Sequence, residues 1–379
     1  MPRKETLLAQ IGLNRDDATG SICTPVYHSA TYRHPSLGES TGYDYARTLN
    51  PTRKILEESI AAMENGTNGH AFSSGMAALT AIFSLFTTGD HFIVSEDLYG
   101  GTFRLIDVVF RQFGFSADFI DTTDLDLVKK SIKTNTKAIL IETPSNPLLR
   151  ITDIRGISNL SRENNLLTII DNTFMTPYLQ RPLDLGADLV VHSGTKYLGG
   201  HNDVLCGLTV SRSKALGERI GFIQNATGGV LSAQDSFLML RGIKTLSVRI
   251  DRAQENSSKI AQWLNGHSAI KKVYYPELPT HSGRDIHLSQ SEGFGAMISF
   301  RVKNAHVAEK IINSVKLISF AESLGGVESL ITYPIIQTHG SIPEDMRNRI
   351  GVTDSLLRLS VGIEHVDDLI ADLSQAIEG

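Results

Sequence analysis

Two residues of this chain, Asp171 and Lys196, have the types and positions that one kind of cofactor chemistry requires. Asp171 ends an apolar run that begins at Leu166, and Lys196 follows a second apolar run, beside the hydroxyl residues Ser193 and Thr195. A lysine amine can form a Schiff base with the aldehyde of pyridoxal 5'-phosphate (PLP), and a carboxylate facing the pyridine nitrogen keeps that nitrogen protonated, so that the ring accepts carbanion electrons. The pair therefore predicts PLP chemistry.

A phosphate site is predicted where the chain turns from a short apolar run at Phe72 through Ser73 and Ser74 into a helical pattern. The start of a helix offers free backbone N–H groups and the positive end of the helix dipole. Taken alone, these residues fit an ordinary helix cap better than a phosphate site. Because the hydroxyls of Ser193 and Thr195 can reach the same phosphate, we favour the phosphate site.

Other chemistries lack their sequence signatures. The run from Gly194 to Lys196 looks like the end of a P-loop, but its hydroxyl residue precedes the lysine and no glycine stands at the required upstream spacing. No G-x-G-x-x-G follows a strand, the G-x-S-x-G at 38–42 follows no apolar strand run, and His192, His201 and His339 match no zinc motif. We expect no nicotinamide enzyme, no serine hydrolase and no metal centre.

The elements that must position these residues are short apolar runs separated by amphipathic stretches. We expect a helix to begin near Pro51 and strands at 91–95, 137–143, 166–171 and 187–193. Continuous β-branched runs indicate parallel strands that are covered on both faces. Glu142, Asp171 and Ser193 stand where such runs end, and ligands of parallel sheets gather at these carboxyl ends.

After about residue 250 the pattern changes to that of a smaller α+β unit, with strand-like runs at 272–275, 297–302 and 317–321 and a helical pattern over 305–315. The polar, Ser-rich stretch 281–293 is expected to be a loop. We predict an N-terminal arm over 1–48, a large cofactor-binding α/β domain over 49–247 and a small α+β domain over 248–379.

The composition fits a soluble globular enzyme, and its charge alone names no partner. With 36 Lys+Arg and 41 Asp+Glu, the formal charge of −5 argues against nucleic acid or a polybasic membrane anchor as a partner. We find no secretory signal and no apolar window long enough to span a membrane. Cys23 and Cys206 form no disulfide framework, and we expect both to be reduced in a cytoplasmic protein.

From Gly20 to Glu364, the chain resembles the Cys/Met metabolism family of PLP enzymes, which includes cystathionine γ-synthase, cystathionine γ-lyase and O-acetylhomoserine sulfhydrylase. The motifs that carry the resemblance are Tyr45-Ala-Arg-Thr-Leu-Asn-Pro-Thr-Arg53, Ser73-Ser-Gly-Met76, Asp97-Leu-Tyr-Gly-Gly-Thr102, Glu142-Thr-Pro-Ser-Asn-Pro147, Val191-His-Ser-Gly-Thr-Lys-Tyr-Leu-Gly-Gly-His201 and Arg358-Leu-Ser-Val-Gly-Ile-Glu364. The resemblance implies the aspartate aminotransferase-like fold (fold type I) and a homotetramer of two catalytic dimers.

The resemblance also implies a role for each matching residue. Lys196 would hold PLP and then move protons, Asp171 would pair with the pyridine nitrogen, and Tyr99 would stack on the ring and shuttle a proton. The phosphate would bind Gly75, Met76, Ser193 and Thr195, together with Tyr45 and Arg47 of a neighbouring subunit. Arg358 would bind the substrate α-carboxylate, with Asn146, Glu322 and Ser323 beside it.

The resemblance leaves the exact reaction open. Glu322 and Gly101 are typical of cystathionine synthases and lyases rather than methionine γ-lyases, and Thr48 replaces the arginine of synthases that use O-succinylhomoserine. We therefore expect L-cystathionine to form from O-acyl-L-homoserine, with the acetyl ester as the better donor, and from L-cysteine, with sulfide as another acceptor. Cystathionine γ-lyase is the alternative, and a non-enzymatic PLP-binding protein is the alternative from another class.

Two departures from the family pattern lie next to the lysine motif. Gly194 replaces a common alanine, and Asn202 replaces a common serine. Cys206 follows the same motif, and we expect it to be a packed small thiol.

Overall fold

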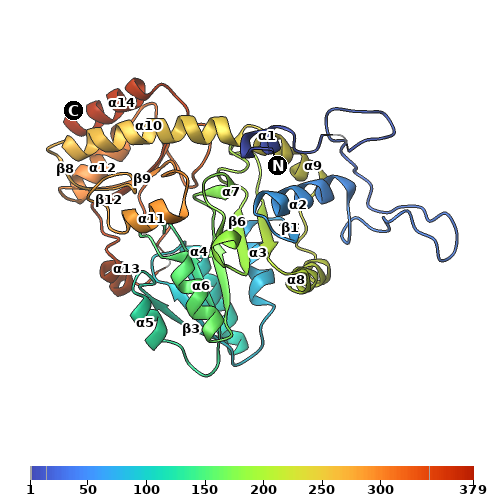
Figure 1. The fold of residues 1–379 in the computed structure, drawn as a ribbon. Coiled ribbons are helices and arrows are strands. Elements are labelled where there is room, and N and C mark those ends of the chain that lie inside the picture. The colour runs from blue at the N-terminus through green and yellow to red at the C-terminus, as the bar shows by residue number, and fades with distance from the viewer. Residues whose placement is uncertain (1, 14, 341) are drawn as a thin grey trace.

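The computed structural model describes residues 2–13, 15–340 and 342–379 (Figure 1). Its strands are β1 (Asn68–Phe72), β2 (His91–Ser95), β3 (Ser116–Ile120), β4 (Thr136–Glu142), β5 (Leu167–Asp171), β6 (Leu189–Ser193), β7 (Gly207–Ser211), β8 (Ile270–Tyr274), β9 (Met297–Val302), β10 (Ser319–Phe320), β11 (Leu330–Thr332) and β12 (Leu356–Ser360). Its α-helices are α1 (Lys4–Ala9), α2 (Pro51–Met63), α3 (Gly75–Phe83), α4 (Gly100–Arg104), α5 (Leu125–Lys130), α6 (Ile154–Glu163), α7 (Thr176–Leu179), α8 (Lys214–Thr227), α9 (Ala233–Ile243), α10 (Leu246–Gly266), α11 (Arg284–Gln290), α12 (Ala305–Ser314), α13 (Glu344–Ile350) and α14 (Val366–Glu378). Short π and 3-10 turns lie at η1 (Leu105–Val109), η2 (Phe110–Phe113) and η3 (Pro182–Leu185).

The large sheet has the strand order β1-β7-β6-β5-β4-β2-β3. All of its pairs are parallel except those that β7 makes with β1 and β6. The expected α/β fold with a mainly parallel sheet is confirmed. The register sets Glu142 opposite Asp171, and Asp171 opposite Val191, so that the carboxyl ends of β4, β5 and β6 meet at one edge.

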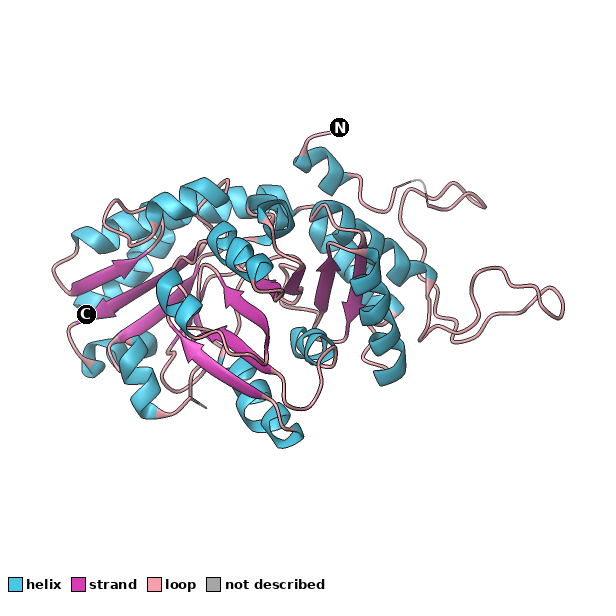
Figure 2. Cartoon of the chain, turned by 60° about the horizontal axis from the view of Figure 1, so that its bottom comes forward, coloured by secondary structure: helices cyan, strands magenta, loops and turns pink. Residues whose placement is uncertain are grey.

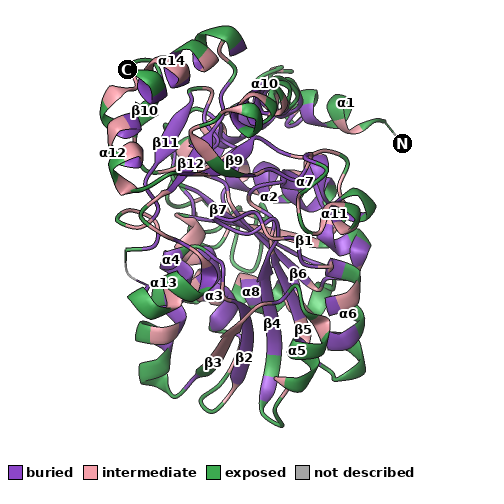
Figure 3. Ribbon diagram, turned by 90° about the vertical axis from the view of Figure 1, so that its left-hand side faces the viewer, coloured by how far each residue is buried: buried purple, intermediate pink, exposed green. Residues whose placement is uncertain are grey.

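Helices cover both faces of this sheet because successive strand residues point in opposite directions. Ile170 packs in the core that holds α2 and α6, whereas its neighbour Ile169 packs in the core beneath α3 and α8. Figure 3 shows buried strands between helices whose outer sides are exposed. The predicted start of α2 at Pro51 is also confirmed, since the Asn50 side chain caps this helix.

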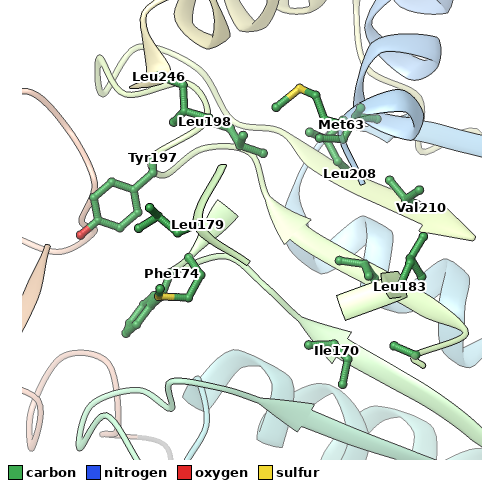
Figure 4. Packing of buried hydrophobic residues seen from close by; sticks show 14 of the residues in the cluster. Met63, Ile170, Phe174, Leu179, Leu183, Tyr197, Leu198, Leu208, Val210 and Leu246 are labelled. Carbon is green, nitrogen blue, oxygen red and sulfur yellow. The ribbon is translucent and has the colours of Figure 1, made fainter. Parts of the chain in front are cut away.

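The turn that carries Lys196 is anchored in the first of these cores. Tyr197 and Leu198 are 2% and 1% exposed. Figure 4 shows them among apolar side chains that include Leu179 and Leu246. The two residues that follow the lysine therefore hold its backbone in place.

The C-terminal part forms a second, mainly antiparallel sheet of order β10-β11-β12-β9-β8, which packs on α10, α12 and α14 (Figure 2). The long helix α10 links the two parts: Ile250 packs in the first core and Ile260 in the second. The division of the chain at 247/248 stays a prediction, and α10 begins at Leu246.

The expectation of a loop over 281–293 is wrong, because this stretch contains α11. Gly283 enters this helix with φ of +81°, and His287 and Gln290 are buried against the rest of the molecule. Their tertiary contacts outweigh the low helix propensity of the polar, Ser-rich sequence.

The N-terminal segment contains the short helix α1 and then extends away from the body as an irregular arm (Figures 1 and 2). Ile22 and Leu37 on this arm have relative exposures of 70% and 105%. Across the described ranges of the chain, the structure has no helix that is both long and apolar enough to cross a membrane.

Candidate active site

A cavity of about 560 Å³ opens at the carboxyl edge of the large sheet and extends to β12 of the second sheet. Cavities of this size commonly hold a cofactor or a drug-sized ligand. It is lined by the predicted site residues Gly75, Met76, Tyr99, Asn146, Asp171, Ser193, Thr195, Lys196, Glu322, Ser323 and Arg358. The structure thus brings together all of the predicted residues except Tyr45 and Arg47.

Lys196 lies in the turn after β6, and its amine donates a hydrogen bond to the hydroxyl of Ser323 at 2.6 Å. Burial, and then the nearby Arg358 cation, lower the pKa of Lys196 to about 8, while Glu322 acts in the opposite direction. A lysine with this pKa is partly neutral near neutral pH, and only a neutral amine can attack an aldehyde.

Asp171 is the last residue of β5 and accepts hydrogen bonds from the backbone N–H of Thr173 at 3.0 Å and from its hydroxyl at 2.5 Å. Burial raises the pKa of Asp171, and these two bonds oppose that effect. A protonated ring nitrogen facing the carboxylate would offset its burial.

Glu142, which faces Asp171 in the register, accepts a bond from the backbone N–H of Tyr99 at 3.1 Å. Burial, and then the negative charge of Asp171, raise the pKa of Glu142 well above its ordinary value. The negative charge of the pair is therefore less favourable on Glu142, where burial and Asp171 act in the same direction.

The phosphate end lies where α3 begins beside β6. The Ser74 hydroxyl caps α3 by accepting from the backbone N–H of Ala77 at 3.1 Å, so the ordinary cap interpretation is correct, and Ser74 also lines the cavity. At Gly75, a Cβ atom would come within 3.2 Å of the Ser193 Cβ. A glycine there keeps the start of the helix open for a ligand.

Thr195 is placed differently from the expectation of a hydroxyl free to bind phosphate. Its hydroxyl donates to the backbone carbonyl of Cys206 at 3.3 Å and accepts from the Cys206 N–H at 3.0 Å. It therefore also joins the lysine turn to the segment that leads into β7.

Arg358 on β12 has the surroundings of a carboxylate-binding residue. It is 1% exposed, and its terminal nitrogens donate to the Asn146 side-chain oxygen at 2.8 Å, the Ser323 carbonyl at 2.9 Å and the Thr332 hydroxyl at 3.1 Å. Burial lowers the pKa of Arg358 to about 10, which leaves it charged at neutral pH. Its Nε is buried and has no hydrogen-bond partner among the described residues.

Tyr99 lines the cavity with 40% relative exposure, and Gly101 fixes the place of its ring. A Cβ atom at position 101 would lie 2.3 Å from Cε1 of Tyr99. Any larger residue at position 101 would have to displace the ring.

Tyr45 and Arg47 do not line the cavity of their own chain. The Arg47 guanidinium donates to the backbone carbonyl of Asn225 and, at 3.0 Å, to its side-chain oxygen, and Tyr45 is 48% exposed. A role in the cavity would have to come from the arm of another subunit.

Several residues of the site were not predicted as members of it: Arg104, Thr173, Thr332 and, at the cavity mouth, the exposed Leu205 and Ile336. The pattern Asp-x-Thr at 171–173 was a usable signal, because a carboxylate commonly accepts the N–H two residues later. No sequence signal pointed to Arg104, since a lone arginine in an amphipathic stretch is ordinary.

The structure explains both departures beside the lysine. A Cβ atom at Gly194 would lie 2.9 Å from the Sγ of Cys206 and 2.9 Å from the Cε of Met239. Asn202 has φ of +56°, a conformation that asparagine tolerates better than serine does, and its side chain donates to Glu328 at 2.8 Å. Cys206 is fully buried, and burial raises the pKa of its thiol, as fits a packed small side chain.

The residues present fit PLP: a partly neutral lysine, a carboxylate whose pKa is raised by burial, and an open helix start. The model of the family described as Cys/Met metabolism PLP-dependent enzyme matches residues 5–378. The chain belongs to this family.

Members of this Cys/Met metabolism family that are similar to the chain bear names of different reactions. "Cystathionine gamma-synthase/O-acetylhomoserine (thiol)-lyase" of Bacillus subtilis (strain 168) is 50% identical over 373 residues, covering 98% of this chain and 96% of the relative. "Cystathionine beta-lyase" of Lactococcus lactis subsp. cremoris (strain MG1363) is 49% identical over 367 residues, covering 97% of each chain.

A solved structure gives the same result at the level of the fold. Cystathionine gamma-lyase from Lactobacillus plantarum, complexed with L-serine, superposes with a TM-score of 0.96 at 48% identity, covering 99% of this chain and 98% of that chain. The fold is therefore that of the fold type I PLP enzymes, and the cofactor of this Cys/Met metabolism enzyme is PLP. Its chemistry is trans-sulfuration.

Proposed function

We propose that this enzyme forms L-cystathionine by replacement at Cγ, from an O-acyl-L-homoserine, with the acetyl ester preferred, and L-cysteine, and that it also accepts sulfide. The observation that carries the proposal is that one cavity holds Lys196 and Arg358 together with the charged side chains of Arg104 and Glu322. The first two suit the α-amino acid part of the donor. The second two suit the charged groups of an incoming amino acid thiol.

Bound PLP supplies the positively charged ring that stores the electrons released at Cα. Arg358 lines the cavity and holds the α-carboxylate, while Asn146 and Ser323 fix the position of its guanidinium. Lys196 removes the Cα proton and carries protons to and from Cβ. Its pKa of about 8 suits a group that must both accept and return a proton near neutral pH.

Three residues support replacement at Cγ of an acetylated donor. Glu322 lines the cavity and acts electrostatically on Lys196 and Arg358. Gly101 permits the observed position of the Tyr99 ring, from which its hydroxyl can shuttle a proton to the leaving group. Thr48 brings no positive charge for the distal carboxylate of a succinyl ester. The similar relative named as both synthase and thiol-lyase adds support.

We further propose that the arm completes the active site of a neighbouring subunit within a cytoplasmic homotetramer of two catalytic dimers. The arm extends from its own body, exposes Ile22 and Leu37, and carries Tyr45 and Arg47 outside the cavity of its own chain (Figure 2). A single subunit therefore has no Arg47 in its own cavity, where the phosphate is expected to bind.

Cystathionine γ-lyase is the second candidate. A solved structure of that name is 48% identical over nearly the whole chain, and the same Lys196, Arg358 and Glu322 can serve cleavage of cystathionine. In that reaction Lys196 returns a proton to the carbon skeleton instead of a thiol adding to it, and 2-oxobutanoate, cysteine and ammonia are released.

The donor preference gives a direct test. PLP-loaded enzyme receives L-cysteine with either O-acetyl- or O-succinyl-L-homoserine, and cystathionine is quantified. We expect faster use of the acetyl ester, and we expect Thr48→Arg to shift the preference toward the succinyl ester. Thr41→Arg, an exposed threonine on the same arm, is the control and leaves the preference unchanged. Absence of cystathionine with both donors would refute the synthase proposal.

A further inference from the structure

His339 is fully buried next to the cavity but does not line it, although its neighbours Thr338 and Gly340 do. It lies in the segment that follows β11. Its Nε2 is 3.1 Å from the backbone carbonyl oxygen of Asn146, and its Nδ1 is 2.8 Å from the Thr338 hydroxyl. The histidine thus joins the segment 333–340 to the residue that faces Arg358.

The hydrogen bonds determine the form of the ring. A backbone carbonyl can only accept, so Nε2 carries the hydrogen that is donated to Asn146; the Leu98 carbonyl also bonds the ring, and the Thr338 hydroxyl lies 2.8 Å from Nδ1. Burial, and then the nearby Arg358 cation, lower the pKa of His339 to about 4. At neutral pH the ring is therefore uncharged and serves as a fixed donor.

Asn146 contacts both His339, through its backbone carbonyl, and Arg358, through its side chain. Its side-chain oxygen accepts from NH1 of Arg358 at 2.8 Å, and the guanidinium also donates to the Ser323 carbonyl at 2.9 Å. Asn146 is 3% exposed, so no bulk water can replace a lost partner of its carbonyl. The position of the guanidinium then depends on the backbone that His339 holds.

We propose that His339 is a positioning residue for recognition of the substrate α-carboxylate: it anchors Asn146 and so aims Arg358, and it ties this pair to the segment that brings Gln337 and Thr338 to the cavity. The inference rests on the proposed role of Arg358. It assigns no contact between His339 and the substrate or PLP.

Binding of two simple amines separates this role from a general structural one. L-alanine carries the α-carboxylate and ethylamine lacks it, and both can be titrated against PLP-loaded enzyme by the change in cofactor absorbance. Removal of the donor in His339→Ala leaves a buried carbonyl unpaired. We expect about tenfold weaker binding of L-alanine with ethylamine binding and PLP affinity unchanged, and a rise in KM larger than the fall in kcat.

Matched variants complete the test. His339→Gln keeps an N–H donor and is expected to restore most of the L-alanine affinity, and it also serves if the alanine variant does not fold. His287→Ala removes another fully buried histidine, whose Nε2 is 2.8 Å from the Gly293 carbonyl, and is expected to leave the preference for L-alanine intact.

The outcomes distinguish a failure of the positioning role of His339 from a failure of the proposed carboxylate site at Arg358. If Arg358→Gln abolishes the preference for L-alanine but His339→Ala does not change it, the positioning role is wrong. If Arg358→Gln itself leaves the preference unchanged, the proposed carboxylate site is wrong. An equal loss of both amines in His339→Ala, or the same selective loss in His287→Ala, also overturns the inference.

Discussion

The amine of Lys196 donates a hydrogen bond to the hydroxyl of Ser323 at 2.6 Å, and this contact joins the large sheet to the second sheet across the cavity. Ser323 has φ of +84°, a backbone conformation that favours glycine. A non-glycine residue in this region costs about 1–2 kcal/mol, and such strain is concentrated at functional sites. We infer that the strain is tolerated because the hydroxyl orients the lysine.

Two substitutions at Ser323 separate the effect of its hydroxyl on activity from the effect of its backbone strain on stability. Ser323→Ala and Ser323→Gly both remove the acceptor for Lys196, and we expect each to lower kcat about tenfold. Glycine relieves the positive φ, so the free energy of unfolding of Ser323→Gly should exceed that of Ser323→Ala by about 1 kcal/mol, measured by urea denaturation. Full activity in both variants would show that the hydroxyl does not orient Lys196.

The lowered pKa of Lys196 predicts that the active site destabilises the PLP-free protein. Burial moves this pKa from 10.5 to about 8, so between these pH values the unfolded chain holds a proton that the folded chain has released. The contribution of Lys196 to the free energy of unfolding is therefore least favourable below pH 8 and rises with pH through this window. Lys196→Met removes the charge.

We expect PLP-free Lys196→Met to be more stable than the wild type by about 2 kcal/mol at pH 7, a value discounted for the partial exposure of the lysine. The difference should shrink between pH 8 and pH 10, because the folded wild type has released its proton there while its unfolded chain still holds one, so that wild-type stability rises. Urea denaturation at pH 7, 8.5 and 9.5 gives the three values. A difference that stays constant or grows with pH would contradict the burial account.

The contact between Gly194 and Cys206 predicts a coupled pair. Gly194→Ala places a methyl group 2.9 Å from the Cys206 sulfur, and overpacking of this kind costs about 1–3 kcal/mol. Cys206→Ala makes room, so the double variant should be more stable than the sum of the single changes implies, by about 1 kcal/mol in a double-mutant cycle. Gly229→Ala is the control, since its methyl group would meet its nearest neighbour at 3.6 Å. Strict additivity would mean that Met239 alone determines the cost.

The arm predicts complementation between inactive subunits. We expect Arg47→Ala to lower PLP affinity, and Lys196→Ala to abolish turnover. In a mixture refolded or exchanged together, a dimer of the two variants has one site with an intact Lys196 and an intact Arg47 from the other chain. Activity should recover to about a quarter of the wild-type value after random mixing. No recovery, with mixed dimers verified by mass, would place Arg47 in the site of its own chain.

Much of this site could be predicted from local sequence. The apolar runs that end at Glu142, Asp171 and Ser193 indicated where the strands of a parallel sheet stop, and the edge of such a sheet is where ligands bind. The structure places these three ends at one edge. The lysine turn and the start of α3 were visible for the same reason, since glycines and hydroxyls cluster there.

The rest depends on contacts between distant parts of the chain. The direction of β7, the helix α11, the hydrogen bond from Arg358 to Thr332 and the packing of Gly194 against Cys206 all arise from tertiary neighbours. Local patterns do not encode such pairings. Arg104 enters the cavity only because α4 lies beside the edge of the sheet.

Side-by-side initial rates show whether the enzyme replaces a group at Cγ more readily than it cleaves cystathionine. PLP-loaded enzyme receives O-acetyl-L-homoserine with L-cysteine in one vessel and L-cystathionine alone in another; cystathionine, 2-oxobutanoate and pyruvate are quantified. We predict that cystathionine forms faster than either keto acid is released. Faster release of 2-oxobutanoate would establish a γ-lyase instead, and faster release of pyruvate a β-lyase.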